Sequence, residues 1–414
     1  MILSFGIYFT KAKIIRIYSV SQLIMFKFKQ TPEDFIVREV SDEDTLKFIS
    51  KPISNNIPNN HSSNEGNKYN EPNKEIDKDN VQESALAFGE YSYYRLIKKN
   101  CNTIDAITRI ANHWNIYPKF INFAGTKDKN ALTEQLISIK RGPKKGLFLD
   151  NIELKYLGQG NERINLGCLK GNEFEIIVEG DNSPRNMTKT INYFDDQRFG
   201  VNMDNHIIGK LLLQRKFKDV CEKLKMVVEA NNYVGALRKI NKRVLLLYLH
   251  AYQSYLWNET VKEFIKRELI KRSDKYFEID YALGELFIPE EMSTVQNHKI
   301  PLIGFGVETD NDVIRDILNA LLVSEGISFS DFVIREMPEI SCVGEDRNML
   351  VDIENLKIEE METEKKTIKN RILKTVNNFK KIFSEQKPEI KKYKLSFFLN
   401  KGSYGTIVLK SLFG

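Results

Sequence analysis

An acidic residue in a short polar loop is the first side chain of this sequence with a pattern suited to catalysis. Asp128 lies in the run AGTKDKNALTEQ (Ala124–Gln135), where a glycine after an apolar stretch lets the backbone turn sharply. The lysines on either side of Asp128 favour its ionised form, which a nucleophile needs. Many ordinary polar turns have the same pattern, so on its own it identifies no activity.

A second segment groups the side chains that a nucleobase pocket needs. The run INYFDDQRFG (191–200) offers an aromatic ring for stacking, an amide for a base edge and a guanidinium for phosphate or a carboxylate. A half-buried strand with an arginine–aspartate pair is the simpler interpretation of the same residues. The segment therefore indicates a candidate base-binding site without assigning one.

A third segment contains a lysine suited to be a charge partner. Lys29 lies in the run FKQTPEDF (28–35), just before a turn that contains Pro32. From that position its ammonium group could reach a carboxylate elsewhere in the fold. Most lysines are simply solvated, and this segment alone does not separate the two alternatives.

Composition and spacing argue against several classes of protein. The 414 residues hold 62 Lys and Arg against 56 Asp and Glu, and a net charge of +6 permits a nucleic-acid partner without requiring one. The four cysteines form no CxxC pair and the five histidines no metal-binding spacing, so we expect reduced thiols in the cytoplasm and no bound metal. The sequence has no glycine-rich phosphate loop and no apolar run of about 18 residues, so neither a nucleotide cofactor nor a membrane span is indicated.

The hydrophobic pattern predicts strands towards both ends of the chain and a helix-rich middle. A helix is expected to begin at Asn102 or Thr103, and a long helical region to extend from about 206 to 269. Residues 365–383 also have helical spacing, with lysines on the polar face. The predicted strands are the stretch from Met25 to the turn at 31–34, then 35–37, 91–96, 136–139, 172–178, 395–398 and 406–409.

Two segments are predicted to lie outside the folded core. Residues 49–83 are rich in Asn, Ser, Lys and Glu and lack periodicity, so they are expected to form a mobile loop, with an RNA-binding tail as the alternative. Residues 1–25 are interpreted as an extension before an alternative start at Met25, or else as a weak targeting peptide.

Taken together, the three segments resemble the TruD family of tRNA pseudouridine synthases, in matching order along the chain. The family patterns Lys-x-x-Pro-Glu-Asp-Phe, AGTKDxxAxTxQ and NYFGxQRFG correspond to residues 29–35, 124–135 and 192–200. Weaker family-like blocks lie at 167–174, 250–258, 344–347 and 399–409. Three long blocks in order outweigh the simpler interpretations above, and the resemblance covers residue 26 to the C-terminus apart from the 49–83 loop.

The resemblance implies an α+β fold in two domains. One is a pseudouridine synthase catalytic domain, a mixed and largely antiparallel sheet flanked by helices, expected at 26–214 and 346–414. The other is an inserted α/β domain, the TRUD domain, expected at 215–345, and residues 1–25 precede both as an N-terminal extension. RNA is expected in the cleft between the domains, with its target base flipped out of the stack.

The resemblance also implies an activity and roles for individual residues. Pseudouridine synthases cleave the N-glycosidic bond of a uridine in RNA and rejoin the ribose through C5, without a cofactor. Asp128 carries over as the nucleophile, or as a base that forms a glycal, and Lys29 as its charge partner. Phe194 is expected to stack on the uracil, and Asn192 to hold the loop or a base edge. Two weaker candidates for substrate binding are Gln197 and Arg198.

The implied partner is tRNA, at position 13 in the family, although related enzymes modify other positions and other RNAs. We therefore expect a cytoplasmic enzyme that needs no metal and no cofactor, with no membrane association and no obligate protein partner. The basic runs at 140–145 and 365–394 are candidate phosphate contacts or, alternatively, solvated faces.

Two other functions compete with catalysis on uridine. A non-catalytic RNA-binding protein on the same scaffold would have no need to retain Lys29, Asp128, Asn192 and Phe194 together. A different RNA-modifying enzyme, such as a methyltransferase, would need a glycine-rich cofactor loop after a strand, which this sequence lacks.

The chain departs from the family pattern at three positions. Asp195 stands where the family usually has Gly, Gly405 replaces a usual Ala, and Asn400 replaces a usual Pro. Asp195 is the departure expected to matter most, because it adds a negative charge beside the predicted pocket. We expect it to affect substrate detail more than the chemistry.

Overall fold

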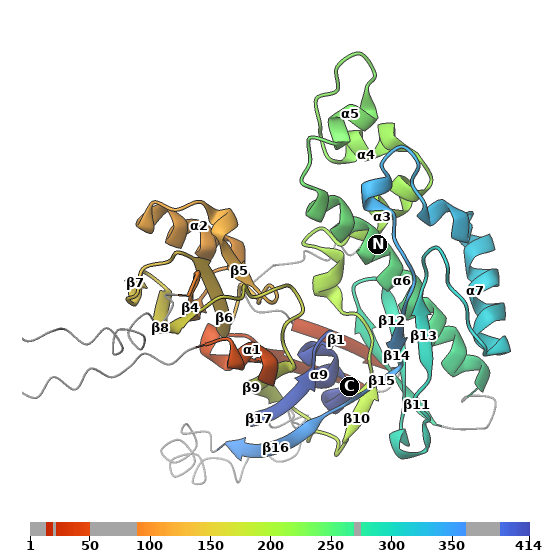
Figure 1. Ribbon diagram of the computed structural model, residues 1–414. Coiled ribbons are helices and arrows are strands. Elements are labelled where there is room, and N and C mark those ends of the chain that lie inside the picture. The colour runs from red at the N-terminus through yellow and green to blue at the C-terminus, as the bar shows by residue number, and fades with distance from the viewer. Residues whose placement is uncertain (1–13, 20–21, 50–88, 269–274, 362–389) are drawn as a thin grey trace, which may run out of the picture. The chain divides into compact units, whose positions relative to one another are not determined.

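The computed structural model describes residues 14–19, 22–49, 89–268, 275–361 and 390–414 (Figure 1). They form two compact units, one of residues 31–171 and one of residues 172–414 with the segment up to residue 30. Both units combine strands and helices, so the α+β class is confirmed. The predicted loop at 49–83 and the predicted helix at 365–383 fall almost wholly outside the described residues. The predicted insert at 215–345 stays a prediction.

The unit of residues 31–171 is built on a mixed sheet. Its strands in spatial order are β3 (Phe35–Val40), β6 (Leu132–Lys140), β4 (Tyr91–Lys99), β8 (Ile152–Gly160) and β7 (Leu147–Leu149), with β5 (Ile121–Phe123) also beside β6. β3 and β6 are parallel, and the other pairs are antiparallel. β4 pairs with β6 along its whole length, so the end of β4 at Lys99 lies opposite the start of β6 at Leu132.

Helix α2 (Thr103–Trp114) covers the core of this unit (Figure 1). Asn102 caps it by accepting a hydrogen bond from Asp105 N at 2.8 Å, as the sequence predicts. Its buried Ile107 and Ile110 belong to the same cluster as Leu96 of β4. Burying each such side chain contributes about 1.5–3 kcal/mol. The predicted turn at 31–34 is a short 3₁₀ helix (Pro32–Asp34) that leads into β3, and a short helix α1 (Glu43–Lys47) follows β3.

Strands of the other unit also lie side by side. In spatial order they are β1 (Ile14–Ser19), β2 (Gln22–Phe28), β9 (Gly171–Gly180), β17 (Lys391–Asn400) and β16 (Glu354–Met361). Part of the predicted N-terminal extension is therefore a strand, β1, paired with β2. The strand β17, near the C-terminus, lies between β9 and β16, so the strands predicted towards the two ends of the chain lie in one sheet.

Three two-stranded ladders and several helices complete this unit. The ladders are β10 (Lys189–Ile191) with β15 (Leu350–Asp352), β11 (Tyr276–Tyr281) with β12 (Gly284–Pro289), and β13 (Lys299–Leu302) with β14 (Glu345–Asn348). The predicted helical region consists of α3 (Asn205–Leu213), α4 (Phe217–Lys223), α5 (Tyr233–Leu237) and α6 (Lys242–Glu268). The chain leaves the helical conformation after α3 and again after α4, where Arg215 and Lys225 adopt positive φ angles that end a helix.

Helix α6 is the central element of this unit (Figure 1). Its 27 residues make it about 40 Å long, and α3, α7 (Asp312–Glu325), β12 and β13 pack around it. Trp257 is fully buried in α6 and donates its Nε1 hydrogen to Ile300 O at 3.0 Å. Helix α3 approaches α6 so closely at Gly209 that an added Cβ would lie 2.2 Å from Tyr248 O.

One predicted strand is wrong. Residues 406–409 belong to helix α9 (Gly405–Phe413), in which the residues from Ile407 to Phe413 are all buried. A short apolar run that is buried on every side has no polar face to reveal its period, so a strand and a helix look alike in the sequence.

The part of the chain that the structure describes contains no helix with the length and apolar character needed to cross a bilayer.

Gly209→Ala tests the close contact of α3 and α6. Helix propensity alone favours alanine by about 0.5–1 kcal/mol, but the new methyl group would meet backbone that cannot yield. We expect the free energy of unfolding to fall by about 1–3 kcal/mol, measured by urea denaturation followed by circular dichroism. Ile207→Ala, at an exposed position of the same helix, is the control and should change it much less. A Gly209→Ala variant as stable as the wild type would contradict the close packing.

Candidate active site

The loop that carries Asp128 joins β5 to β6 and is held through its main chain. Gly125 O accepts a hydrogen bond from Gln135 Nε2 at 3.0 Å, and Lys127 N donates to Thr103 Oγ1 at 2.9 Å. Thr103 and Gln135 are themselves buried and joined by a hydrogen bond of 3.1 Å. The loop is therefore tied both to the start of α2 and to β6, while the side chain of Asp128 stays partly exposed.

A buried lysine from β4 lies beneath the same loop. Lys98 is 1% exposed, and its Nζ donates to the carbonyl oxygens of Cys101 at 2.7 Å, Asp128 at 2.7 Å and Lys127 at 3.3 Å. The three hydrogens of the ammonium group match these three acceptors. Burial lowers the pKa of Lys98 to about 8.

The lysine before Asp128 has a carboxylate partner of its own. Lys127 forms an ion pair with Glu39, whose side chain is fully buried. The prediction that Lys127 favours the ionised form of Asp128 stays a prediction. Lys129, the other flanking lysine, is exposed.

The Asn192 segment continues the ladder of β10 and β15. Asn192 N donates to Met349 O at 2.7 Å, and Asn192 Nδ2 donates to Asn348 O at 3.3 Å. Arg347 Nη2 donates to both the main-chain oxygen and the side-chain oxygen of Asn192, each at 2.7 Å. Every polar group of Asn192 is thus used to hold this segment in place.

Phe194 is fixed by a reciprocal pair of hydrogen bonds and by neighbouring rings. Asn258 of α6 accepts from Phe194 N at 2.9 Å and donates to Phe194 O at 2.8 Å. The ring meets Trp257 and Tyr404 edge to face, with centroids 5.6 and 5.9 Å away. The side chain is only 3% exposed, so its orientation is well defined.

Two guanidinium groups lie close to the ring of Phe194. The Cζ atom of Arg347 is 4.1 Å from the ring centroid and that of Arg198 is 5.3 Å away, distances typical of cation–π contacts. Burial lowers the pKa of Arg347 to about 10. Arg198 Nε donates to Ser254 Oγ at 2.9 Å, whereas Gln197 is exposed.

Residues to which the sequence analysis assigned no role support both segments. Arg347, Trp257, Asn258 and Tyr404 come from the weaker blocks at 344–347, 250–258 and 399–409, and those blocks were the signal that could have found them. For Lys98 the signal is a lysine that alternates with apolar residues on the buried face of a strand, after Tyr94 and Leu96.

The predicted four-residue set is divided between the two compact units. Asp128 belongs to residues 31–171, whereas Lys29, Asn192 and Phe194 belong to the other unit. Lys29 has a left-handed backbone with a φ angle of 57°, an uncommon conformation for a residue other than glycine. The structure brings Asn192 and Phe194 together with Arg198 and Arg347. The convergence of Lys29 and Asp128 stays a prediction.

The departure at Asp195 is compensated inside the protein. Asp195 is 3% exposed and its Oδ1 accepts a hydrogen bond of 2.6 Å from Lys410 of α9, which is 1% exposed. Burial alone would raise the pKa of Asp195, but the Lys410 ammonium more than offsets this and lowers it. The expected extra charge beside the pocket is thus neutralised by a buried cation.

The departure at Gly405 fits the local packing. An added Cβ there would lie 2.8 Å from the Phe174 ring, so the family's usual Ala would be crowded.

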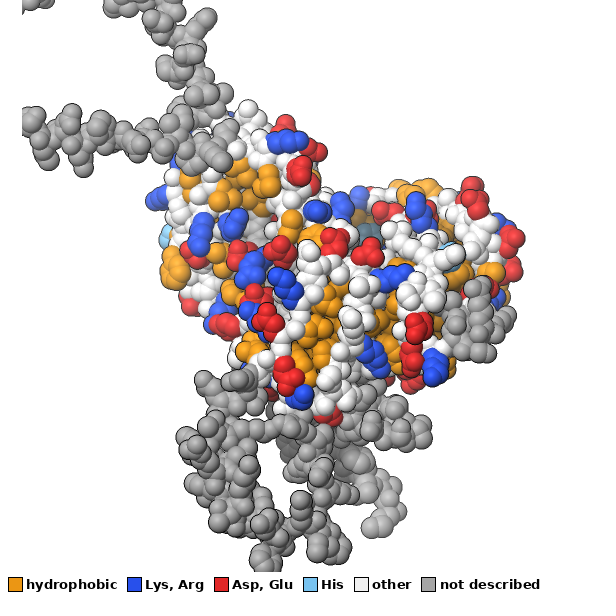
Figure 2. Space-filling model, turned by 90° about the horizontal axis from the view of Figure 1, so that it is seen from below, with side chains coloured by type: hydrophobic (Ala, Val, Ile, Leu, Met, Phe, Trp, Pro, Cys, Tyr) orange, Lys and Arg blue, Asp and Glu red, His pale blue; other side chains and the backbone are white. Residues whose placement is uncertain are grey.

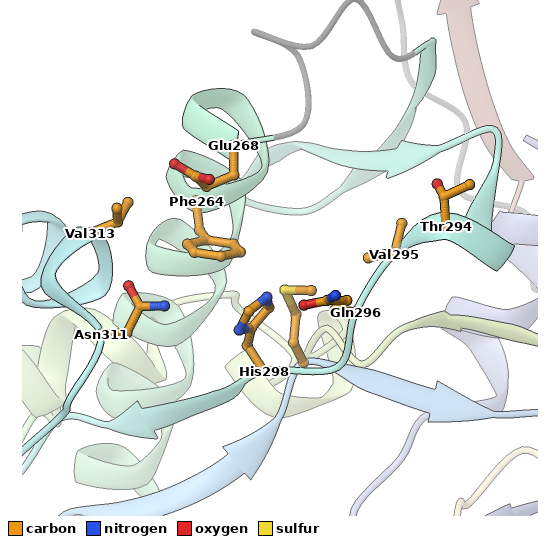
Figure 3. Close-up of a pocket in the computed structure, with 9 residues that line it drawn as sticks. Phe264, Glu268, Thr294, Val295, Gln296, His298, Asn311 and Val313 are labelled. Atoms are coloured by element: carbon orange, nitrogen blue, oxygen red, sulfur yellow. The ribbon is translucent and has the colours of Figure 1, made fainter.

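A cavity of about 230 Å³ lies near the Asn192 segment (Figure 3). Phe264, His298 and Asn311 line it, and its Met349 is the residue whose carbonyl accepts from Asn192 N. The cavity is smaller than typical ligand pockets and contains none of the predicted site residues. We therefore do not assign it to the substrate.

Charge does not mark out an RNA-binding surface on the face drawn in Figure 2. Lysine and arginine side chains are interspersed there with acidic ones among the described residues. In the basic run at 140–145, Lys140 pairs with Glu90 at 2.8 Å. The lysines of the 365–394 run that lie in described parts of the chain also pair with glutamates, namely Lys391, Lys392 and Lys394. The predicted phosphate contacts of both runs stay predictions.

No group of three His, Cys, Asp or Glu side chains suited to a metal ion occurs within the described ranges. Each compact unit holds one candidate segment that buried polar side chains fix: the Asp128 loop in one unit and the Asn192–Phe194 segment in the other.

The family comparison matches almost the whole chain. The model of the family described as tRNA pseudouridine synthase D (TruD) matches residues 15–226 and 220–412. A Nanoarchaeum equitans protein that carries the same description is 31% identical over 438 residues, covering 94% of this chain and 98% of its own. The tRNA pseudouridine synthase D of Aquifex aeolicus is 28% identical over 402 residues, covering 82% of this chain and 95% of its own.

A solved structure has a similar fold. The crystal structure of a protein described as tRNA pseudouridine synthase D from Methanosarcina mazei superposes with a TM-score of 0.53 at 22% sequence identity, covering 93% of both chains. The chain is therefore an α+β protein that carries Asp128 in a loop fixed through its main chain and Phe194 in a segment fixed by Asn258. This chain belongs to the TruD family of tRNA pseudouridine synthases, which are isomerases.

Lys410→Met tests the buried ion pair with Asp195. It would leave the Asp195 carboxylate buried without its cation, so we expect the free energy of unfolding at pH 7 to fall by about 3–5 kcal/mol. The double variant Asp195→Gly with Lys410→Met removes both charges and should recover most of that loss. Urea denaturation of both variants measures the difference.

The same pair predicts an acid dependence. Because folding lowers the pKa of Asp195, the unfolded state binds the proton more readily than the folded state. The stabilising contribution is therefore present above the usual value of 3.8 and is lost as the pH falls below it. The wild type should lose more stability between pH 5 and pH 3 than the double variant, and equal losses would contradict the pairing.

Proposed function

We propose that this chain isomerises a uridine of tRNA to pseudouridine, with Asp128 as the catalytic carboxylate. Family membership and the names of the relatives support the substrate and the reaction. The assignment of Asp128 is supported by the structure of its loop. Hydrogen bonds to Gln135, Thr103 and Lys98 fix the main chain there. A fixed main chain with a partly exposed carboxylate is suited to attack at a defined position.

The reaction needs a carboxylate and no external reagent. The N-glycosidic bond of the uridine breaks, the detached uracil turns, and a bond forms between C1′ of the ribose and C5 of the base. The proton on C5 is lost and N1 gains a proton, so atoms and electrons balance without a cofactor. Asp128 acts either as a nucleophile or as a base that forms a glycal, and both alternatives use its ionised form.

Lys29 is proposed as the charge partner of Asp128. An ammonium group near a carboxylate favours its ionised form. This assignment rests on the family resemblance, because the left-handed backbone of Lys29 is shared by ten other non-glycine residues of the described chain.

Phe194 is proposed as the platform for the target uracil; because the ring is only 3% exposed in this structure, a neighbouring side chain has to move before the base can stack on it. A base that reacts must leave its stack at a cost of a few kcal/mol, and an aromatic ring held at a fixed angle offsets part of that cost. The two guanidinium groups beside the ring suit the carbonyl oxygens of uracil or a neighbouring phosphate. Because the side chain of Asn192 is used by Arg347 and Asn348, we assign Asn192 to holding the segment rather than to a base edge.

A hollow beside the Asp128 loop is the candidate contact for the RNA backbone. It has a volume of about 460 Å³, and two cations (Arg109 and Lys129) and two amides (Asn100 and Asn151) line it, against one carboxylate, Asp105. These cationic and amide groups are suited to phosphate oxygens. A target at position 13, a flipped base in a cleft and the domain division at 215–345 belong to the same proposal and rest on the family resemblance.

Asp128→Asn is the test of the catalytic assignment. The amide is isosteric but can neither attack nor accept a proton, so product formation should fall by at least about 10²-fold. The measurement uses purified enzyme and a tRNA transcript, without added cofactor, and maps pseudouridine in the product. The affinity for the transcript should stay within about threefold, and Asp44→Asn, at an exposed position of helix α1 in the same unit, is the matched control.

Two results would change the proposal. Appreciable turnover by Asp128→Asn would show that another residue is catalytic. An unmodified transcript with the wild-type enzyme, under conditions where the RNA binds, would instead favour the non-catalytic RNA-binding protein.

A further inference from the structure

The lysine beneath the Asp128 loop is unusual in where it is and in what it contacts. Lys98 is 1% exposed on the buried face of β4, and its three hydrogen-bond acceptors are all main-chain carbonyls. Lysines are almost never fully buried unless a partner compensates the charge. The fall in the pKa of Lys98 to about 8 has burial as its largest cause, which reflects that cost.

Replacing Lys98 with an apolar residue would remove three hydrogen bonds inside the unit. The carbonyls of Cys101, Lys127 and Asp128 converge on one point inside the unit, and Nζ of Lys98 is the donor that reaches all three. A buried carbonyl without a hydrogen-bond partner destabilises the fold. An apolar side chain would leave these carbonyls unpaired or force the loop to rearrange.

The geometry links this contact directly to the position of the Asp128 carboxylate. Nζ of Lys98 holds the carbonyls on both sides of the Asp128 Cα atom, since Lys127 O precedes it and Asp128 O follows it. Rotation of either peptide would swing the side chain that starts from that Cα atom. A misplacement of about 1 Å at a reacting group can cost about 10²-fold in rate.

We propose that Lys98 is a positioning residue for catalysis, whose buried ammonium group sets the direction of the Asp128 carboxylate by holding the two peptide carbonyls that flank it. The proposal rests on the proposed catalytic role of Asp128. Lys98 contacts neither substrate nor reacting atoms in this assignment. It acts through the loop, so its loss should lower the rate of the chemical step and leave tRNA binding largely unchanged.

The test compares Lys98→Met with Lys99→Met in the full-length enzyme. Lys99 is the next residue of β4, but its side chain is 41% exposed and pairs with Glu33, so it is the matched control. Single-turnover rates and dissociation constants are measured with the tRNA transcript. Hydrogen exchange is followed in the peptide that covers residues 124–131. We expect Lys98→Met to lower the rate by about 10²-fold, to change the dissociation constant by less than about threefold and to speed exchange in that peptide.

The control should stay within about twofold of the wild type in all three measurements. A folded Lys98→Met variant with a wild-type rate, or with a slower rate but unchanged exchange at 124–131, would overturn the proposal. If Lys98→Met does not fold, Lys98→Gln replaces it: its shorter amide can donate to at most two of the three carbonyls, so a smaller loss of rate with faster exchange at 124–131 is expected, and wild-type values of both would overturn the proposal. If Asp128→Asn remains active, the catalytic assignment of Asp128 fails instead, and the exchange result still shows whether Lys98 fixes the loop.

Discussion

The position of the predicted catalytic carboxylate depends on main-chain hydrogen bonds to buried polar side chains. Asp128 lies in a loop with no helical or strand pairing of its own, so its backbone groups need other partners. Lys98, Thr103 and Gln135 supply them from β4, the start of α2 and β6. The strand pairing of β4 with β6 brings these side chains to one end of the sheet, and the loop takes its form from them.

The aromatic segment of the other unit is held by the same means. Arg347 and Asn258 bond to the main chain of Asn192 and Phe194, and Trp257 and Tyr404 fix the angle of the Phe194 ring. Each unit therefore presents its chemical group on a segment without regular structure, and buried polar side chains make that segment rigid. This arrangement suits a reaction that needs a defined geometry and no cofactor.

The departure from the family at Asp195 shows how such a site accommodates change. A carboxylate beside Phe194 would be costly if it stayed buried alone, but Lys410 of α9 pairs with it at 2.6 Å. The added negative charge of Asp195 is thus compensated by Lys410, where α9 packs against the segment that carries Phe194. Its consequence belongs to stability and acid sensitivity more than to the charge that a substrate meets.

The sequence by itself determined the α+β class, the family, the helix capped by Asn102 and the segments that carry Asp128, Asn192 and Phe194. These follow from local patterns and from motifs in a fixed order. Only the tertiary structure showed that 406–409 is helical, that Lys127 serves Glu39, and that Lys98 and Arg347 support the two segments. Their roles depend on contacts between residues far apart in the chain, such as Arg347 and Asn192. Burial at these contacts determines whether a charged group is solvated by water or bonds to another part of the protein.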